Sequence, residues 1–174
     1  SLTLPPAGSV FVVFSEVPAN VRIATAEGVA YLNNSNLSPA LELKGPWRLS
    51  FSKRFGAPES IVFDELTSWS ESPDPGVKYF SGVVTYEKTF DLPASTAKDA
   101  RKLTLDLGDV KEVAEVYVNG RSVGVVWTPP YRVDISAAAK PVENELKVEV
   151  INLPANRLIG DQAYPAGGSH TKSN

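Results

Sequence analysis

Apolar and polar residues alternate with a period of two in several parts of the chain. The alternation runs through residues 47–51, 103–107 and 146–150. A strand with this pattern buries one face and exposes the other, which is typical of antiparallel sheets. A further pair of strands is predicted over residues 113–126, because Asn119-Gly120 at its centre can supply the positive φ angles of a tight hairpin turn.

Helical patterns are weak by comparison. Residues 95–102 and 135–140 could each form a turn or two, but neither carries a long amphipathic stripe and both lie close to a proline. The chain has 14 prolines and 12 glycines, mostly between the predicted strands. Short strands separated by such turn residues predict an all-β fold, an antiparallel β-sandwich.

The first forty residues differ from the rest. Residues 10–14 form a continuous apolar run, as in a strand that is buried on both faces, and residues 15–40 have little periodicity. We therefore expect residues 1–14 to be a closing strand left from a preceding domain, residues 15–40 to be a connector, and residues 41–174 to form the sandwich.

Charge and composition exclude several classes of protein. The net charge is −3 and no basic cluster is present, which argues against a nucleic-acid surface or an anionic-membrane patch. No apolar stretch is long enough to span a bilayer. The chain has no cysteine, so thiol catalysis, disulfides and cysteine-ligated metals are excluded.

Two further absences concern chemistry and origin. The single histidine, His170, lies in a Gly/Ser-rich tail, which argues against a Ser-His-Asp triad and against a multi-histidine metal site. The chain contains no methionine, even at position 1, so we expect it to be a processed or excised piece of a longer product.

A set of short motifs then carries a family resemblance. They are Gly45-Pro46-Trp47, Leu66-Thr67-Ser68-Trp69-Ser70, Tyr79-Phe80-Ser81-Gly82, Thr85-Tyr86-Glu87-Lys88-Thr89-Phe90, Leu105-Asp106-Leu107-Gly108, Ala114-Glu115-Val116-Tyr117-Val118-Asn119-Gly120, Val123-Gly124, Trp127-Thr128-Pro129-Pro130-Tyr131-Arg132-Val133-Asp134, Asn144-Glu145-Leu146 and Asn156-Arg157-Leu158-Ile159-Gly160-Asp161. Over about three quarters of its length the chain resembles the C-terminal sugar-binding-like domain of family 106 glycoside hydrolases, the α-L-rhamnosidase type. More broadly it is similar to the jelly-roll, galactose-binding-like domain of the family 2 hydrolases.

The resemblance implies a jelly-roll fold and a non-catalytic accessory role in a secreted or periplasmic glycosidase. The family's catalytic carboxylates lie in a large domain that would precede this one, and no position here matches them, so no catalytic residue is assigned. Family members continue past the point that matches Asn174 with a last strand. We therefore expect the domain to lack that edge element or to end in disorder.

Aromatic side chains on loops are the best candidates for contact with sugar. Flat C–H faces of sugars stack on Trp and Tyr, and Arg hydrogen-bonds hydroxyl groups. Trp127, Tyr131 and Arg132 provide this mixture on a loop stiffened by two prolines, while Trp69 and Tyr79 flank a second Pro-rich loop. The structural alternative for each aromatic residue is packing in the core or against a neighbouring domain.

The remaining polar candidates have structural alternatives as well. Arg157, four residues before Asp161, is read first as a local ion pair in a loop and second as a donor to sugar hydroxyls. Glu71 and Asp74 lie in a Pro-rich loop where two catalytic carboxylates could converge, but acidic residues in turns are far more often solvated. No cofactor is expected. Calcium would suit carboxylate loops of such domains, but no Asp-x-Asp-x-Asp spacing occurs, so no metal site is predicted.

Together these points predict a carbohydrate-binding accessory domain that hydrolyses no glycoside by itself. Its expected partners are plant or bacterial polysaccharide side chains and the catalytic domain of a parent chain. The alternative is a purely structural domain that braces the catalytic domain and has no affinity for sugar. The sequence does not choose between these, because stacking aromatics and interface aromatics look alike.

Overall fold

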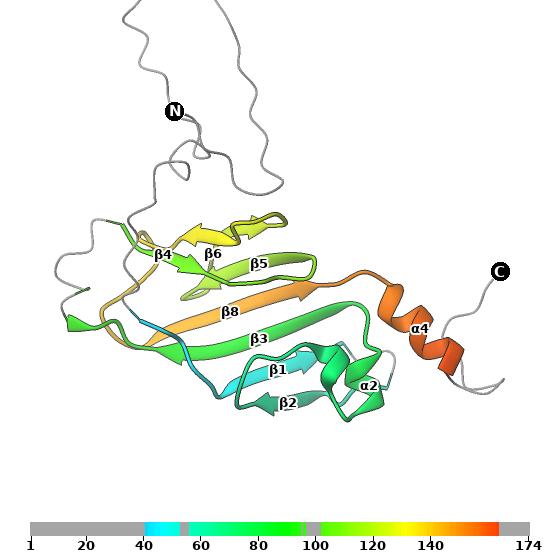
Figure 1. Ribbon diagram of the computed structural model, residues 1–174. Helices are drawn as coiled ribbons and strands as arrows, with labels where there is room; N and C mark the ends of the chain where they lie inside the picture. Colours follow the sequence, from blue (N-terminus) through cyan, green and yellow to red (C-terminus); the bar gives the residue numbers. More distant parts are fainter. Residues whose placement is uncertain (1–40, 53–55, 95, 97–101, 164–174) are drawn as a thin grey trace, which may run out of the picture.

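The computed structural model describes residues 41–52, 56–94, 96 and 102–163, which form an antiparallel β-sandwich (Figure 1). The strands are β1 (Trp47–Phe51), β2 (Ser60–Phe63), β3 (Val83–Phe90), β4 (Thr104–Asp106), β5 (Val113–Val118), β6 (Arg121–Val126), β7 (Arg132–Asp134) and β8 (Asn144–Ile151). The helices with described bounds are η1 (Trp69–Glu71), α2 (Pro75–Lys78) and α4 (Ala155–Ala163). The all-β class predicted from the alternation is confirmed. The expected closing strand and connector, residues 1–40, lie outside the described residues.

The larger sheet has six strands in the order β2-β1-β3-β8-β5-β6, and β4 pairs with β7 in a second sheet of two strands. Every pairing is antiparallel. Strand β8, the last in sequence, lies between β3 and β5, so the chain crosses over as in a jelly roll rather than running as a simple meander.

Residues that alternate along the strands of the six-stranded sheet build the core. Leu49, Val84, Val116 and Val118 are fully buried, and Val133 and Ile135 from the β7 region pack in the same cluster. The registers place Leu49, Tyr86, Val148 and Val116 in one line across four strands, on the inner face. The intervening residues lie on the outer face.

Asn119 does more than form the hairpin turn. Its φ is 53°, as the turn requires, and its side-chain amide donates to Ala138 O (2.8 Å) and to Asn144 Oδ1 (3.0 Å). The fully buried Asn144 in turn accepts from Lys140 N (2.7 Å) and donates to Phe90 O (3.3 Å). These bonds satisfy the buried amide and connect the hairpin to the loop that precedes β8.

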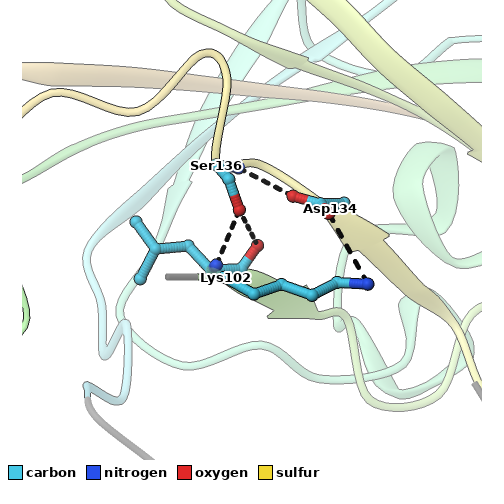
Figure 2. Close-up of polar contacts among 4 residues, drawn as sticks. Lys102, Asp134 and Ser136 are labelled. Atoms are coloured by element: carbon cyan, nitrogen blue, oxygen red, sulfur yellow. Dashed lines mark hydrogen bonds and ion pairs between the residues drawn. The ribbon is translucent and has the colours of Figure 1, made fainter. Parts of the chain in front are cut away.

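A polar cluster closes the end of the two-stranded sheet (Figure 2). Leu103 N donates to Ser136 Oγ (2.7 Å), Ser136 N donates to Asp134 Oδ1 (2.9 Å), and Lys102 Nζ lies 3.7 Å from Asp134 Oδ2. Burial alone would raise the pKa of Asp134, but the hydrogen bonds from Ser136 and the charge of Lys102 outweigh it and lower that pKa. The cluster joins the segments before β4 and after β7.

Candidate carbohydrate-binding site

The loop that leaves β6 presents an exposed aromatic ring. Trp127 directly follows β6 and is 70% exposed, the most exposed of the large apolar side chains in the described residues. Three residues further on, Pro130 leads to Tyr131, whose ring is half-buried against the core. Leu107 N donates to Tyr131 O (2.9 Å), which ties the loop to the end of β4. The loop is therefore fixed at Tyr131 by a backbone hydrogen bond, while the side chain of Trp127 is exposed to solvent.

Charged groups stand beside this loop. Arg132, the first residue of β7, donates through Nε to Asp106 Oδ2 at 2.7 Å. Its two Nη groups make no hydrogen bond within the described residues. Lys111 pairs with Asp109 (2.9 Å) in the loop before β5. The hydrogen bond to Asp109 and the charge of that carboxylate raise the pKa of Lys111.

These groups lie at one end of the sandwich because of the strand order. β5 begins just after Lys111 and β6 ends just before Trp127, and Ala114 pairs with Val126 across that pair of strands. Trp127, Tyr131 and Arg132 thus lie on the segment from the end of β6 to the start of β7, and Asp106 joins them through its ion pair with Arg132. Asp106 was not predicted as a site residue; in the sequence it is distinguished only by its place in the motif Leu105-Asp106-Leu107-Gly108.

Trp69 is in a different environment. It is only 8% exposed, and its ring makes edge contacts with Phe51 and Phe80 at centroid distances of 6.3 and 6.0 Å. Its indole Nε1 donates to the Tyr86 hydroxyl at 2.6 Å. The structure places Trp69 in the core, which corrects its assignment to a sugar-contacting loop, because neither face of the ring is open to a ligand.

Tyr79, the second aromatic residue predicted to contact sugar beside this Pro-rich loop, has a packing role instead. It is half-buried at the C-terminal end of α2, and its Cβ and ring lie against Gly160 of α4. A Cβ atom at position 160 would come within 2.6 Å of Tyr79 Cβ, so the glycine permits the close approach of the helix. Tyr79 therefore serves to pack α4.

Arg157 is buried as part of the same contact. It is 4% exposed, and its Nε and Nη2 donate to Asp161 Oδ1 at 3.0 and 2.8 Å. Its backbone N–H donates to Ser81 Oγ at 3.0 Å. The local ion pair expected from the sequence is present, but it lies on a helix rather than in a loop, and the guanidinium points into the protein.

The two carboxylates considered for catalysis lie in or beside short helices. Asp74 caps α2 by accepting from Gly76 N (2.7 Å), and Glu71 lies in η1. Within the described residues no three His, Cys, Asp or Glu side chains gather where they could hold a metal ion. No helix in the same part of the chain is long and apolar enough to cross a membrane.

The core around Trp69 gives a testable pH dependence. Burial raises the pKa of Tyr86 from about 10 to about 12, and the hydrogen bond from Trp69 offsets only part of this rise. The unfolded chain therefore loses this proton first as the pH rises. We expect stability to be unaffected by Tyr86 below pH 10 and to fall by about 2–3 kcal/mol as the pH rises to 12.

Urea unfolding followed at a series of alkaline pH values measures this loss. Tyr86→Phe removes the titrating group, and we expect its stability to fall less steeply over the same pH range. An equally steep fall in both proteins would show that other groups cause the alkaline loss.

Comparison with known proteins gives three findings. The family model described as glycosyl hydrolase 2 galactose-binding domain-like matches residues 62–170. A putative beta-glucuronidase of Formosa agariphila is 45% identical over 123 residues, which are 71% of this chain and 11% of that protein. The chain thus spans about a tenth of the length of this curated relative.

Among solved structures, the rhamnosidase from Novosphingobium sp. PP1Y matches with a TM-score of 0.71 and 42% identity, over 77% of this chain and 13% of that one. The beta-glucuronidase of Ruminococcus gnavus matches with a TM-score of 0.54 and 25% identity, over 67% of this chain and 23% of that one. In each case the similar region is a small part of a much longer polypeptide.

Proposed function

The chain belongs to the family of glycosyl hydrolase 2 galactose-binding-like domains, and on that premise we propose that it is a non-catalytic module that binds carbohydrate for a glycoside hydrolase. Catalysis would belong to another domain of a longer polypeptide, and the enzyme would act outside the cell or in the periplasm. We infer no cofactor and no metal for this role.

The exposed indole of Trp127 is the observation that carries the proposal. An aromatic ring that is 70% exposed, on a loop fixed at its base, offers a flat apolar face without first having to leave a core. The ion pair of Arg132 and Asp106 supplies donors and acceptors for hydroxyl groups a few residues away. Trp69, Tyr79 and Arg157 have no part in this site, because Trp69 and Arg157 are buried and Tyr79 is half-buried against Gly160 of α4.

We propose rhamnose-bearing glycans as the first ligands to test. The proposal rests on the likeness to the rhamnosidase of Novosphingobium, and the likeness to two beta-glucuronidases makes glucuronate-bearing glycans the second choice. Galactose-bearing polysaccharides complete the set, because the matching family is described as galactose-binding-like.

Replacement of Trp127 by alanine tests the site directly. Loss of the stacking face should weaken sugar binding by about ten- to a hundredfold, equivalent to about 1–3 kcal/mol, in isothermal titration against the glycans above. Because the ring is exposed, the melting temperature should change little. Val125→Ala is the matched control: Val125 is an exposed residue of the adjacent strand, and its truncation should leave affinity unchanged.

The opposite pattern would contradict the proposal. If the unsubstituted chain binds none of these glycans, or if Trp127→Ala binds them with full affinity, the assignment of the site to Trp127 is wrong.

A second function, bracing of a catalytic domain, is favoured by the outward side of α4. Leu158 and Ile159 are exposed there, while Arg157 and Gly160 face the sandwich. A helix with its apolar residues outside and its charged pair inside is suited to contact with another protein surface. If bracing is the function, Trp127 would lie in the interface with the catalytic domain, and the unsubstituted 174-residue chain would bind no sugar.

A further inference from the structure

Three apolar side chains form a line across the outer face of the six-stranded sheet. Val83 on β3 pairs with Ile151 on β8, and Ile151 pairs with Val113 on β5. Directly paired residues of an antiparallel ladder share a face. The following residues, Val84 and Ala114, are fully buried, so Val83, Ile151 and Val113 lie on the outer face. We call these three residues the outer apolar row.

The outer apolar row lies across β3, β8 and β5, which are neighbours in the larger sheet, with β6 beside β5 (Figure 1). Val83 is 41% and Ile151 44% exposed, and Val113 is half-buried. Exposed Val125 lies on the same face of β6, since it pairs with Glu115, and Trp127 follows Val126 at the end of that strand. Isolated exposed valines are ordinary, but an apolar line across neighbouring strands indicates a contact surface.

We propose that residues 10–14 of the same chain cover the outer apolar row. This run, Val-Phe-Val-Val-Phe, carries no charge and lies outside the described residues. In the 174-residue chain it is the longest uninterrupted run of large apolar residues, so water is an unfavourable environment for it. The inference extends beyond sugar binding and does not depend on it.

The apolar run is long enough to cover the row. The outer apolar row crosses three neighbouring strands, β3, β8 and β5, which is about 10 Å at the usual spacing between strands. Five extended residues span about 13–16 Å. The chain between position 14 and the first described residue, position 41, can extend to more than about 80 Å, several times the radius of a domain of this size.

The neighbouring outer rows of the sheet fit an uncharged segment less well. The next outer row toward the middle of the sheet holds Thr85, Glu149 and Glu115, which pair across the same three strands. Lys147, one row further, contacts Glu149 (2.9 Å) and the ring of Tyr117 (3.9 Å to its centroid). Among these outer rows of β3, β8 and β5, the row of Val83, Ile151 and Val113 is therefore the one that offers an apolar segment apolar partners on all three strands.

Disulfide trapping tests this contact cleanly, because the natural chain has no cysteine. The test variant carries Val12→Cys with Ile151→Cys, which joins the middle of the run to the middle of the row. The matched control carries Val12→Cys with Val62→Cys. Val62 is exposed on the outer face of β2, beyond β1 and β3 and at the level of Lys147.

Both proteins are oxidised at low concentration and separated on a non-reducing gel. We expect most of the test variant, and less than about a fifth as much of the control, to form an intrachain disulfide that reduction reverses. Equal trapping in both, or trapping in neither, would overturn the proposal. Disulfide-linked dimers of the test variant would overturn it too, since a second copy would then occupy the row.

A second pair of variants guards against misfolding of the cysteine proteins. Val12→Asp should increase binding of a hydrophobic dye about as much as deletion of residues 1–14, while Ser9→Asp, just outside the run, should leave it unchanged. If Val12→Asp binds no more dye than the parent protein, the row is not covered by this segment. Loss of sugar binding would not produce this pattern, so failure of the proposed function is distinguishable.

Discussion

Trp69→Ala should lower the free energy of unfolding by about 3–5 kcal/mol. The substitution removes a ring that contacts Phe51 and Phe80 edge-on, leaves a cavity among buried side chains, and deprives the Tyr86 hydroxyl of its donor. Urea unfolding followed by circular dichroism measures the change. Trp69→Phe, which keeps a ring in the cluster, should recover a large part of the loss.

Trp127→Ala is the natural comparison for this experiment. It deletes the same side chain from an exposed position, so we expect a loss of stability below about 1 kcal/mol. A similar loss from both substitutions would show that Trp127 is buried in solution. A stable Trp69→Ala protein would contradict the core position of Trp69.

Arg157→Met should cost a similar amount, about 3–5 kcal/mol, for an electrostatic reason. The side chains of Arg157 and Asp161 are only 5% and 11% exposed. Removing the guanidinium alone leaves the Asp161 carboxylate largely out of water without its cation, which is more harmful than removing both charges. The double variant Arg157→Met with Asp161→Leu should therefore be more stable than Arg157→Met alone. Urea unfolding of the two single variants and the double variant gives the coupling energy.

An exposed pair in the same chain is the control. Lys44 and Glu42 are 3.2 Å apart with side chains 76% and 78% exposed, so Lys44→Met should change stability by less than about 1 kcal/mol. If the double variant at positions 157 and 161 is as unstable as the sum of its two single variants, the pair does not act as a unit.

The strands were predictable because their signal is local. In β1, β5 and β8 alternate residues face the core, and this alternation is visible in the sequence itself. β2 has only four residues, with exposed Ser60 and Val62 alternating with half-buried residues, so its pattern is too short and too weak to predict a strand.

Helix α4 was missed for a different reason. Its buried residues are Arg157 and Gly160, and its exposed residues include Leu158 and Ile159. The usual rule places apolar residues inside, so this helix has the reverse of the expected pattern. What stabilises it is the ion pair with Asp161 and the close approach of Gly160 to Tyr79, and neither contact can be inferred from periodicity.

The candidate site was predictable only in part. Trp69 and Trp127 both lie beside Pro-rich segments and look alike in the sequence. Trp69 is buried by Phe51 and Phe80, which come from other elements of the fold, whereas Trp127 meets no such partners. The difference between a core ring and an open ring is thus set by the tertiary arrangement. Asp106, the partner of Arg132, was missed because β4 and β7 are separated by the β5–β6 hairpin.

The central position of β8 has a consequence for how the protein is made. Of the described strands β8 is synthesised last, yet it forms ladders with both of its neighbours, β3 and β5. Until residue 151 has emerged, the larger sheet exists only as two separate pieces, β2-β1-β3 and β5-β6, each with an open edge. The β3–β8 ladder joins residues about 60 positions apart, and such distant pairings form slowly. Nascent chains of this domain are therefore exposed to edge-to-edge aggregation until β8 has been synthesised and has paired.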